Sequence, residues 1–237
     1  MINKYLNRIK YALWQMRITA GFNSGLRHNF HELTWLERIA YLIFKRPKLT
    51  EQQRFFYEGH WGLRGQMYSA ERKCLYDTIL NNKPRFCLEI GTYTGGGSTF
   101  FLASAFKKVG QGKLHTLETE DYFFQKAKKY YLQHLPRLTP FIEFYKGSDI
   151  GKFKQLLDEN GGCDCALLDG AEDGKETLRQ YEFLKPYFRH GSLLIMHDWN
   201  TAKTEMIRPA IQNEPRWKLI TELRPPESVG MTVFRYE

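Results

Sequence analysis

From residue 85 onward the chain alternates between short apolar runs and amphipathic stretches, and this pattern constrains the fold more than any other feature. Apolar runs of strand length are expected at 85–91, 113–118, 142–146, 163–169, 192–197, 217–223 and 231–236. Helical patterns separate the first five runs. Repeated strand–helix–strand units build a mostly parallel sheet with helices packed on both faces. The sequence therefore predicts an α/β fold around a mostly parallel seven-stranded sheet.

The first of these runs leads into a glycine-rich turn. The stretch FCLEIGTYTGGGS places Glu89 and Gly91 at the strand end and Ser98 at the start of a helix. Glycine lets the backbone approach a ligand closely, and a helix N-terminus offers unpaired N–H groups to an anion. The next run ends at Glu118, where an acid can accept hydrogen bonds from a ribose. The pattern favours a nucleotide-like ligand over the alternatives, a tight turn and a solvated acid.

The segment from about residue 65 to the C-terminus resembles the class I S-adenosylmethionine-dependent methyltransferases, in particular the small-molecule O-methyltransferase branch. The resemblance rests on stretches in the family's order: MYSAERKCL, CLEIGTYTGGGST, LHTLE, YKGSD, CALLDGAED and GSLLIMHDW. It implies a Rossmann-like sheet, S-adenosylmethionine as cofactor, and methyl transfer to a hydroxyl of a small molecule or sugar. The run Gly95–Gly97 makes the turn one residue longer than the family's usual pattern, so the role of each glycine is open.

The resemblance also implies which residues contact the cofactor. They run from its methionine end to its adenine: Glu89 and Gly91 at the methionine, Tyr93, Gly95 and Ser98 along the amino-acid part, Glu118 at the ribose, and Ser148 and Asp149 at the adenine. Asp169 at the fourth strand end would face the cofactor amine and the substrate. Ligands of such sheets bind beyond the carboxyl ends of the strands, where all these residues fall.

Two carboxylates, Asp169 and Asp198, follow neighbouring strands and are expected to converge. Such oxygen ligands suit Mg²⁺, Ca²⁺ or Mn²⁺, and Asn200, His197 or Glu172 could supply a further ligand. A bound ion would lower the pKa of a substrate hydroxyl. Metal-dependent relatives carry Asp-Asn or Asp-Asp after the fifth strand, whereas this chain has Asp198-Trp199. A divalent cation is therefore one of two alternatives.

The other alternative is a general base near the acceptor oxygen. His197 and Glu172 are the candidates by position, alongside Asp169. His197 suits this role because the ordinary pKa of histidine lies near neutrality. An equally good interpretation is that the His197 imidazole only packs against the end of the sheet and has no catalytic role.

Positive charge is concentrated at the N-terminus. Residues 1–50 hold nine of the 35 basic residues and two of the 26 acidic ones, so they carry +7 of the net +9. We therefore divide the chain into a basic helical extension, 1–64, and a methyltransferase domain, 65–237. The extension has three candidate roles: a lid and homodimer contact, an anionic membrane surface, or a nucleic-acid contact. Its stretch TWLERIAYLIF is so apolar that we expect it to be buried.

Three classes of function are consistent with these observations. The leading one is an O-methyltransferase, and the alternatives are a nucleic-acid-modifying methyltransferase and a non-catalytic protein that kept the cofactor fold. The nearly neutral main domain makes nucleic acid an unlikely partner. Four cysteines without CxxC spacing indicate reduced thiols, and no secretory signal is evident. We expect a cytoplasmic protein, with a peripheral membrane contact as the alternative.

Overall fold

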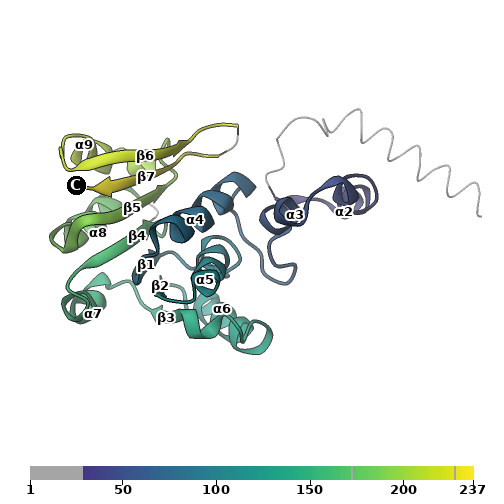
Figure 1. Cartoon of the computed structure of the whole chain (residues 1–237), viewed down its shortest axis with the longest axis horizontal. Coiled ribbons are helices and arrows are strands. Elements are labelled where there is room, and N and C mark those ends of the chain that lie inside the picture. Colours follow the sequence, from purple (N-terminus) through teal and green to yellow (C-terminus); the bar gives the residue numbers. More distant parts are fainter. Residues whose placement is uncertain (1–28, 172, 227) are drawn as a thin grey trace, which may run out of the picture.

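A computed structural model describes residues 29–171, 173–226 and 228–237. Its centre is one seven-stranded sheet with the order β3-β2-β1-β4-β5-β7-β6 (Figure 1). The strands are β1 (Phe86–Ile90), β2 (Lys113–Glu118), β3 (Ile142–Lys146), β4 (Cys163–Leu168), β5 (Phe188–His197), β6 (Trp217–Leu223) and β7 (Met231–Tyr236). The first five are parallel, and β7 runs antiparallel between β5 and β6. The predicted α/β, Rossmann-like sheet is confirmed.

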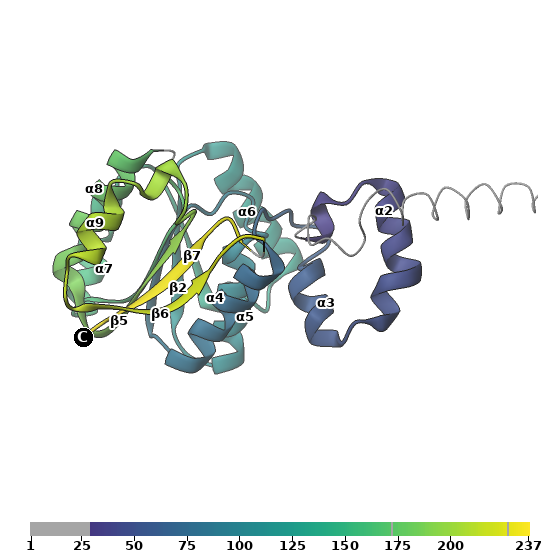
Figure 2. The ribbon, with the colours of Figure 1, turned by 90° about the horizontal axis from the view of Figure 1, so that it is seen from above.

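Helices cover both faces of the sheet, as Figure 2 shows. One layer consists of α4 (Ser69–Asn82), α5 (Ser98–Val109) and α6 (Asp121–His134), and the other of α7 (Lys154–Glu159), α8 (Gly174–Leu184) and α9 (Ile207–Gln212). Side chains alternate between the two layers: Cys87 packs in the α4–α6 core, and its neighbour Leu88 packs in the α7–α9 core. Parallel strands buried on both faces explain why these segments are continuously apolar in the sequence.

The strand register brings the loops after β1, β2 and β4 to one edge of the sheet. Ile90 lies opposite Leu117 of β2 and Leu168 of β4. The chain therefore leaves these three strands at the same level.

Most predicted strand boundaries agree with the structure, and the start of β5 needs correction. Strand β5 starts at Phe188, four residues before the predicted start, because Phe188 pairs with Cys163 of β4 across a register shift. Helix α8 ends at Leu184, and Pro186 lies in a separate 3-10 turn. The N-cap of α4 is Tyr68, so Ser69 is its first helical residue.

The extension joins the domain through helix α3 (Glu51–Glu58). Phe56 and Leu63 are buried in the α4–α6 core. The buried guanidinium of Arg72 in α4 donates to the carbonyl oxygens of Phe56, Tyr57 and Gly65. Residues on both sides of the proposed boundary at 64 are thereby tied to α4.

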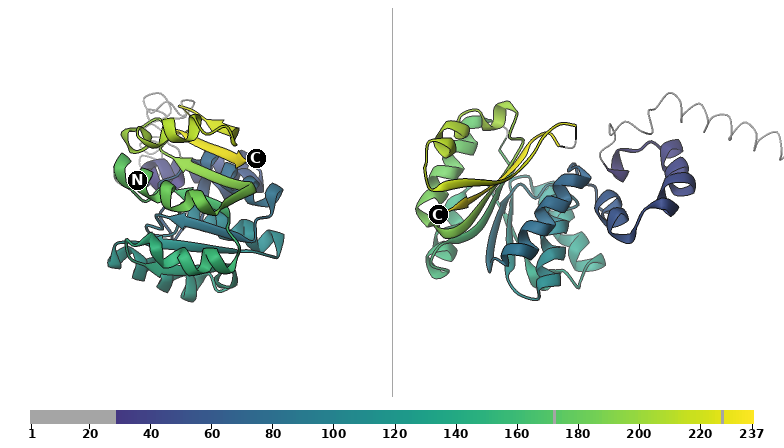
Figure 3. Two further views of the ribbon diagram at one scale, coloured as in Figure 1. Left: turned by 90° about the vertical axis from the view of Figure 1, so that its left-hand side faces the viewer. Right: turned by 45° about the horizontal axis from the view of Figure 1, so that its top comes forward.

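Before α3 come α2 (Trp35–Ala40), a π-helical turn (Tyr41–Lys45) and a 3-10 turn (Arg46–Lys48). Capping boxes start both helices, at Thr34 and at Thr50. Figure 3 shows this unit projecting from the domain. The expectation that TWLERIAYLIF is buried is wrong: its large side chains divide between a packed and an exposed face. The helix expected between residues 2 and 16 lies outside the described residues.

Candidate functional site at the carboxyl ends of the strands

Two glycines let the ends of β1 and β4 approach each other closely. Gly91 follows β1 with φ +106°, and a Cβ there would lie 2.7 Å from Cα of Gly170. A Cβ at Gly170 would lie 2.8 Å from the Gly91 nitrogen. Both positions therefore exclude a side chain, and the backbone at this edge stays open to a ligand.

The extra glycine of the turn has a packing role. A Cβ on Gly96 would lie 2.2 Å from the carbonyl oxygen of Arg64. That oxygen accepts a 2.6 Å hydrogen bond from Thr94 Oγ1. Gly96 thus makes room for the segment that leads from the extension into α4. Gly95, by contrast, has φ +78°, and its carbonyl oxygen accepts from Tyr131.

The acid of β1, Glu89, is fully buried behind the turn. Its Oε2 accepts hydrogen bonds from Thr99 Oγ1 at 2.8 Å and Thr116 Oγ1 at 2.6 Å. Burial raises the pKa of Glu89 from 4.5 to about 7, although nearby hydroxyl groups offset part of the effect. Its Oε1 has no hydrogen-bond partner among the residues that the structure describes. This buried acceptor is available to a donor group of a ligand.

The acid of β2, Glu118, closes the turn from the other side. Its Oε2 accepts from the Tyr93 backbone N–H at 2.6 Å, and its Oε1 accepts from the Glu120 N–H at 2.9 Å. Tyr93 has φ +50°, and its half-exposed ring packs on Phe123. These contacts orient the Glu118 carboxylate at the strand end.

The remaining predicted cofactor residues lie around the same edge. Ser98 is buried in the first turn of α5. Ser148 and Asp149 are exposed in the loop after β3. Asp149 Oδ1 accepts from the Gly151 N–H at 2.8 Å and so caps the following 3-10 turn.

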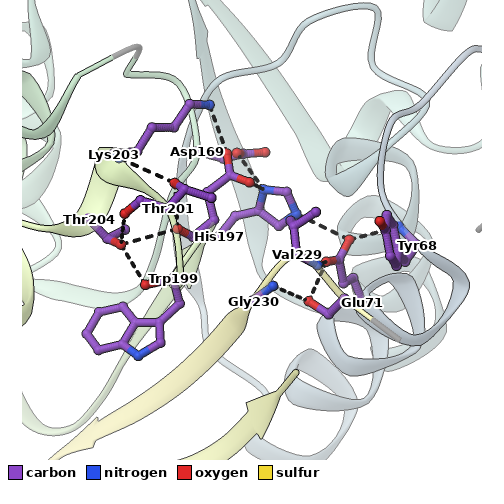
Figure 4. A network of polar contacts seen from close by, with 12 residues as sticks. Tyr68, Glu71, Asp169, His197, Trp199, Thr201, Lys203, Thr204, Val229 and Gly230 are labelled. Atoms are coloured by element: carbon purple, nitrogen blue, oxygen red, sulfur yellow. Dashed lines mark hydrogen bonds and ion pairs between the residues drawn. The ribbon is translucent and has the colours of Figure 1, made fainter. Parts of the chain in front are cut away.

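A network of carboxylates surrounds His197 at the end of β5 (Figure 4). His197 Nδ1 donates to Asp169 Oδ1 at 2.9 Å and lies 3.6 Å from Asp198 Oδ1. Its Nε2 lies 3.2 Å from Glu71 Oε2, an ion-pair distance without the alignment of a hydrogen bond. Burial lowers the pKa of His197, but the carboxylates of Asp169, Asp198 and Glu71 outweigh it and raise this pKa well above 6.5. These carboxylates thus favour the protonated form of His197, which does not suit the role of a base.

Glu71 is the residue of this network that the sequence did not reveal. It is fully buried in α4, and its Oε1 accepts from Ser228 Oγ at 2.5 Å and from the Val229 N–H. Its Oε2 accepts from the Tyr68 N–H and so forms part of the α4 cap. Burial raises the pKa of Glu71, but His197 and these donors outweigh it and lower the pKa. The local sequence signal of Glu71 is that of a helix cap.

The predicted metal ligands are only partly brought together. One atom each of Asp169, His197 and Asp198 lie within 4.8 Å of one another. Asn200 is exposed, and its side chain lies against Gly230. Glu172 lies outside the described residues.

Two cationic side chains of the protein lie among these carboxylates. Lys203 Nζ lies 2.9 Å from Asp198 Oδ2, and the His197 imidazolium lies against Asp169. His197 and Lys203 together hold the pKa of Asp198 well below its ordinary value, although burial opposes them. A divalent ion at these three side chains would have to displace Lys203 from Asp198 and the His197 proton from Asp169. The chain's own cations therefore compete with a metal for this site.

Cavities and packing limit where an acceptor can bind. A cavity of about 10 Å³ beside Asp169, His197 and Lys203 has room for about one water. A larger cavity, about 710 Å³, is a groove over α5 and the end of α6, lined by none of the predicted site residues. Trp199 is buried and packs on Phe234. Neither of these two cavities therefore marks a site for an acceptor.

Comparison with known proteins agrees with this geometry. Residues 88–199 match a family described as a methyltransferase domain, a span that includes Glu89, Glu118, Asp169 and His197. The sheet order and this match agree, and the resemblance to the class I methyltransferases that was drawn from the sequence is confirmed. Comparison with the curated proteins finds no match by sequence.

Solved structures share the whole fold. The O-methyltransferase TomG of Streptomyces achromogenes, involved in tomaymycin synthesis and solved with SAM, is 17% identical with a TM-score of 0.58, over 89% of this chain and 97% of that chain. An O-methyltransferase from Bacillus cereus, solved with SAH, is 18% identical with a TM-score of 0.59, over 86% and 98%. The SAH-bound methyltransferase PaMTH1 of Podospora anserina is 15% identical with a TM-score of 0.56, over 73% and 80%. At these identities the likeness establishes the fold.

Proposed function

We propose that this protein is an S-adenosylmethionine-dependent O-methyltransferase that acts on a hydroxyl of a small molecule or a sugar. The observation that carries the proposal is the set of acids at adjoining strand ends: Glu89 near the end of β1, Glu118 at the end of β2, and Asp169 after β4. Cofactor-bound O-methyltransferases of the same fold support it.

The residues present fit the cofactor. The unpartnered Glu89 Oε1 is an acceptor for an ammonium group, and Glu118 is placed for ribose hydroxyls. Gly91 and Gly170 keep the backbone between them accessible. Tyr93, Gly95 and Ser98 would line the amino-acid part, with Ser148 and Asp149 beside the adenine. When bound, the cofactor supplies a methyl group activated by its sulfonium.

On the acceptor side, Asp169 is the residue that takes the hydroxyl proton. It is one-fifth exposed at the open edge, whereas His197 lies behind it between Asp169 and Glu71. The His197 imidazolium holds the Asp169 carboxylate in place through Nδ1. His197 is thus a positioning residue, and Asp169 orients the acceptor oxygen and removes its proton. This proposal needs no divalent ion, because His197 and Lys203 already pair with the two carboxylates.

The segment before α4 packs on the glycine-rich turn after β1 and forms the base of a lid over it. The Arg64 carbonyl oxygen is bonded to Thr94, and Gly65 touches Gly96. From this contact we propose that the extension, 1–64, covers the catalytic domain, 65–237. Four free thiols, Cys74, Cys87, Cys163 and Cys165, support the proposed cytoplasmic location.

The test is calorimetric titration of S-adenosylmethionine into the wild type, Glu118→Gln and Glu118→Ala. We expect roughly 10- to 100-fold weaker binding for the variants, since a hydrogen bond to a charged group contributes ~1.5–3 kcal/mol. Glu120→Ala, which removes an exposed acid two residues away, is the matched control and should bind normally. Unchanged affinity in both Glu118 variants would refute the ribose assignment.

A second assay separates catalysis from mere binding. The wild type is incubated with S-adenosylmethionine and a panel of phenols, sugars and hydroxylated small molecules, and S-adenosylhomocysteine release is measured. Acceptor-dependent release supports an enzyme. Tight cofactor binding without release on any hydroxyl acceptor would favour the non-catalytic alternative.

A further inference from the structure

We propose that the segment Trp35–Lys48 is a contact surface for membranes that contain anionic lipids. Five large apolar side chains of this segment are exposed: Trp35 (73%), Leu36 (43%), Leu42 (38%), Ile43 (54%) and Phe44 (53%). We call these five residues the apolar face. Contiguous exposed apolar patches are uncommon on soluble proteins and mark interaction sites.

The apolar face is one side of a helical segment whose other side is packed. Residues seven apart lie on the same side of a helix, so Leu42 follows Trp35 and Ile43 follows Leu36. The opposite side carries Tyr41, which is fully buried against Phe30 in a small separate core. The segment is therefore anchored on its inner side while its outer side is presented outward.

The charged residues beside the apolar face indicate what kind of partner it binds. Arg38, Lys45, Arg46 and Lys48 lie on the same segment, and of these Arg46 is paired with Glu58 whereas Lys48 is exposed. The segment's acid, Glu37, is buried and engaged in the cap at Thr34. The sequence before it, 1–28, holds five basic residues and no acidic one. The segment therefore carries a net positive charge, which complements an anionic partner.

A membrane fits this combination better than a second copy of the chain. A two-fold symmetric contact would bring the same cations together across the interface. Tryptophan and other large apolar side chains flanked by Lys and Arg suit the membrane interface, where anionic headgroups meet acyl chains. Within the described residues, no helix is long and apolar enough to cross a bilayer, so the contact would lie at the surface.

The position of the segment permits such a contact. Figure 2 shows α2 and α3 beyond the α4–α6 layer, on the side away from α7–α9. A bilayer can therefore meet the apolar face without meeting the α7–α9 layer.

The experiment is co-sedimentation of the full chain with phosphatidylcholine vesicles, with and without phosphatidylglycerol. We expect binding to the phosphatidylglycerol vesicles that weakens with added salt. Replacement of three residues of the apolar face together (Trp35→Ser, Ile43→Ser, Phe44→Ser) should weaken binding at least about tenfold. The matched control replaces two exposed apolar residues of α6, Tyr122→Ser and Leu132→Ser, and should bind like the wild type.

Two further measurements make the outcome decisive. Lys48→Glu should weaken binding to phosphatidylglycerol vesicles while the far-UV circular dichroism stays unchanged, which separates charge from folding. Sedimentation equilibrium without vesicles reports the alternative partner: a dimer that the triple variant dissociates, with no vesicle binding, would overturn the proposal. Neither measurement uses methyl transfer, so these outcomes are independent of the proposed enzymatic function.

Discussion

The two halves of the strand-end site hold their acids in opposite ways. In the cofactor half, Glu89 and Glu118 accept hydrogen bonds from hydroxyl groups and backbone N–H groups, all of them neutral. In the acceptor half, Asp169 and Asp198 face the cations His197 and Lys203. The consequence appears in the pKa values: burial raises that of Glu89 to about 7, whereas neighbouring cations lower that of Asp198. A carboxylate of the cofactor half can thus still bind a cationic group of a ligand. The carboxylates of the acceptor half already pair with cationic side chains of the protein.

The largest expected effect is on the acid that we propose as proton acceptor. Asp169→Asn should lower turnover by ~10²–10⁴, the usual contribution of a positioned acid–base group, with S-adenosylmethionine affinity changed only a few-fold. Turnover and calorimetry on the same preparations measure the two quantities. The control is Asp173→Asn, because asparagine also caps a helix and Asp173 caps α8. Near-normal turnover in Asp169→Asn would remove Asp169 from catalysis.

The next effect is on stability, through Glu71. Glu71→Gln leaves His197 without one of its buried charge partners, and we expect a loss of about 3 kcal/mol in the free energy of unfolding. Urea unfolding measures it, with the exposed Glu182→Gln of α8 as control. If charge pairing stabilises the acceptor half, the free energy of unfolding of Glu71→Gln is well below that of Glu182→Gln. Equal stabilities would show that the network contributes no net charge pairing.

A smaller effect distinguishes the cofactor half by its pH dependence. Because the pKa of Glu89 is raised from 4.5 to about 7 on folding, its contribution to stability is fully present below 4.5 and is lost as the pH rises through 7. Relative to Glu89→Gln, the wild type should lose about 1.4 kcal/mol per pH unit inside that window. Urea unfolding of both proteins at several pH values measures the difference. A constant difference across the window would contradict the raised pKa.

The smallest expected effect is that of chelation. Since Lys203 and His197 already neutralise the acceptor half, excess EDTA should leave turnover unchanged, and added Mg²⁺, Ca²⁺ or Mn²⁺ should not increase it. Abolished activity that a divalent ion restores would contradict our assignment and revive the metal alternative.

The sequence predicted the sheet well because parallel strands buried on both faces leave a strong local signal. The bounds of β2, β3, β6 and β7 agree with the prediction, whereas β5 was started too late. The residues that follow Phe188 in this strand, Arg189 and His190, are polar and exposed, so no apolar pattern marks the start of β5. The pairing of Phe188 with Cys163 decides that boundary, and pairing is a tertiary property.

The candidate site was predictable where it follows from strand ends. Asp169, His197 and Asp198 meet because parallel strands end at one edge, which the motif order already implied. Glu71 was not predictable, since its contact with His197 depends on how α4 packs beside β5. The exposure of Phe44 was mispredicted for a related reason: apolar spacing tells which residues share a face but not whether that face is covered.

The hydrogen bond between Glu71 and Ser228 joins positions 157 residues apart. A domain generally folds as a unit. This bond ties the helix before the first strand to the loop between the last two strands. A chain that ends before residue 228 would leave the buried Glu71 without its Ser228 donor, so the last residues of the chain take part in completing a site whose other acids lie far earlier in the sequence.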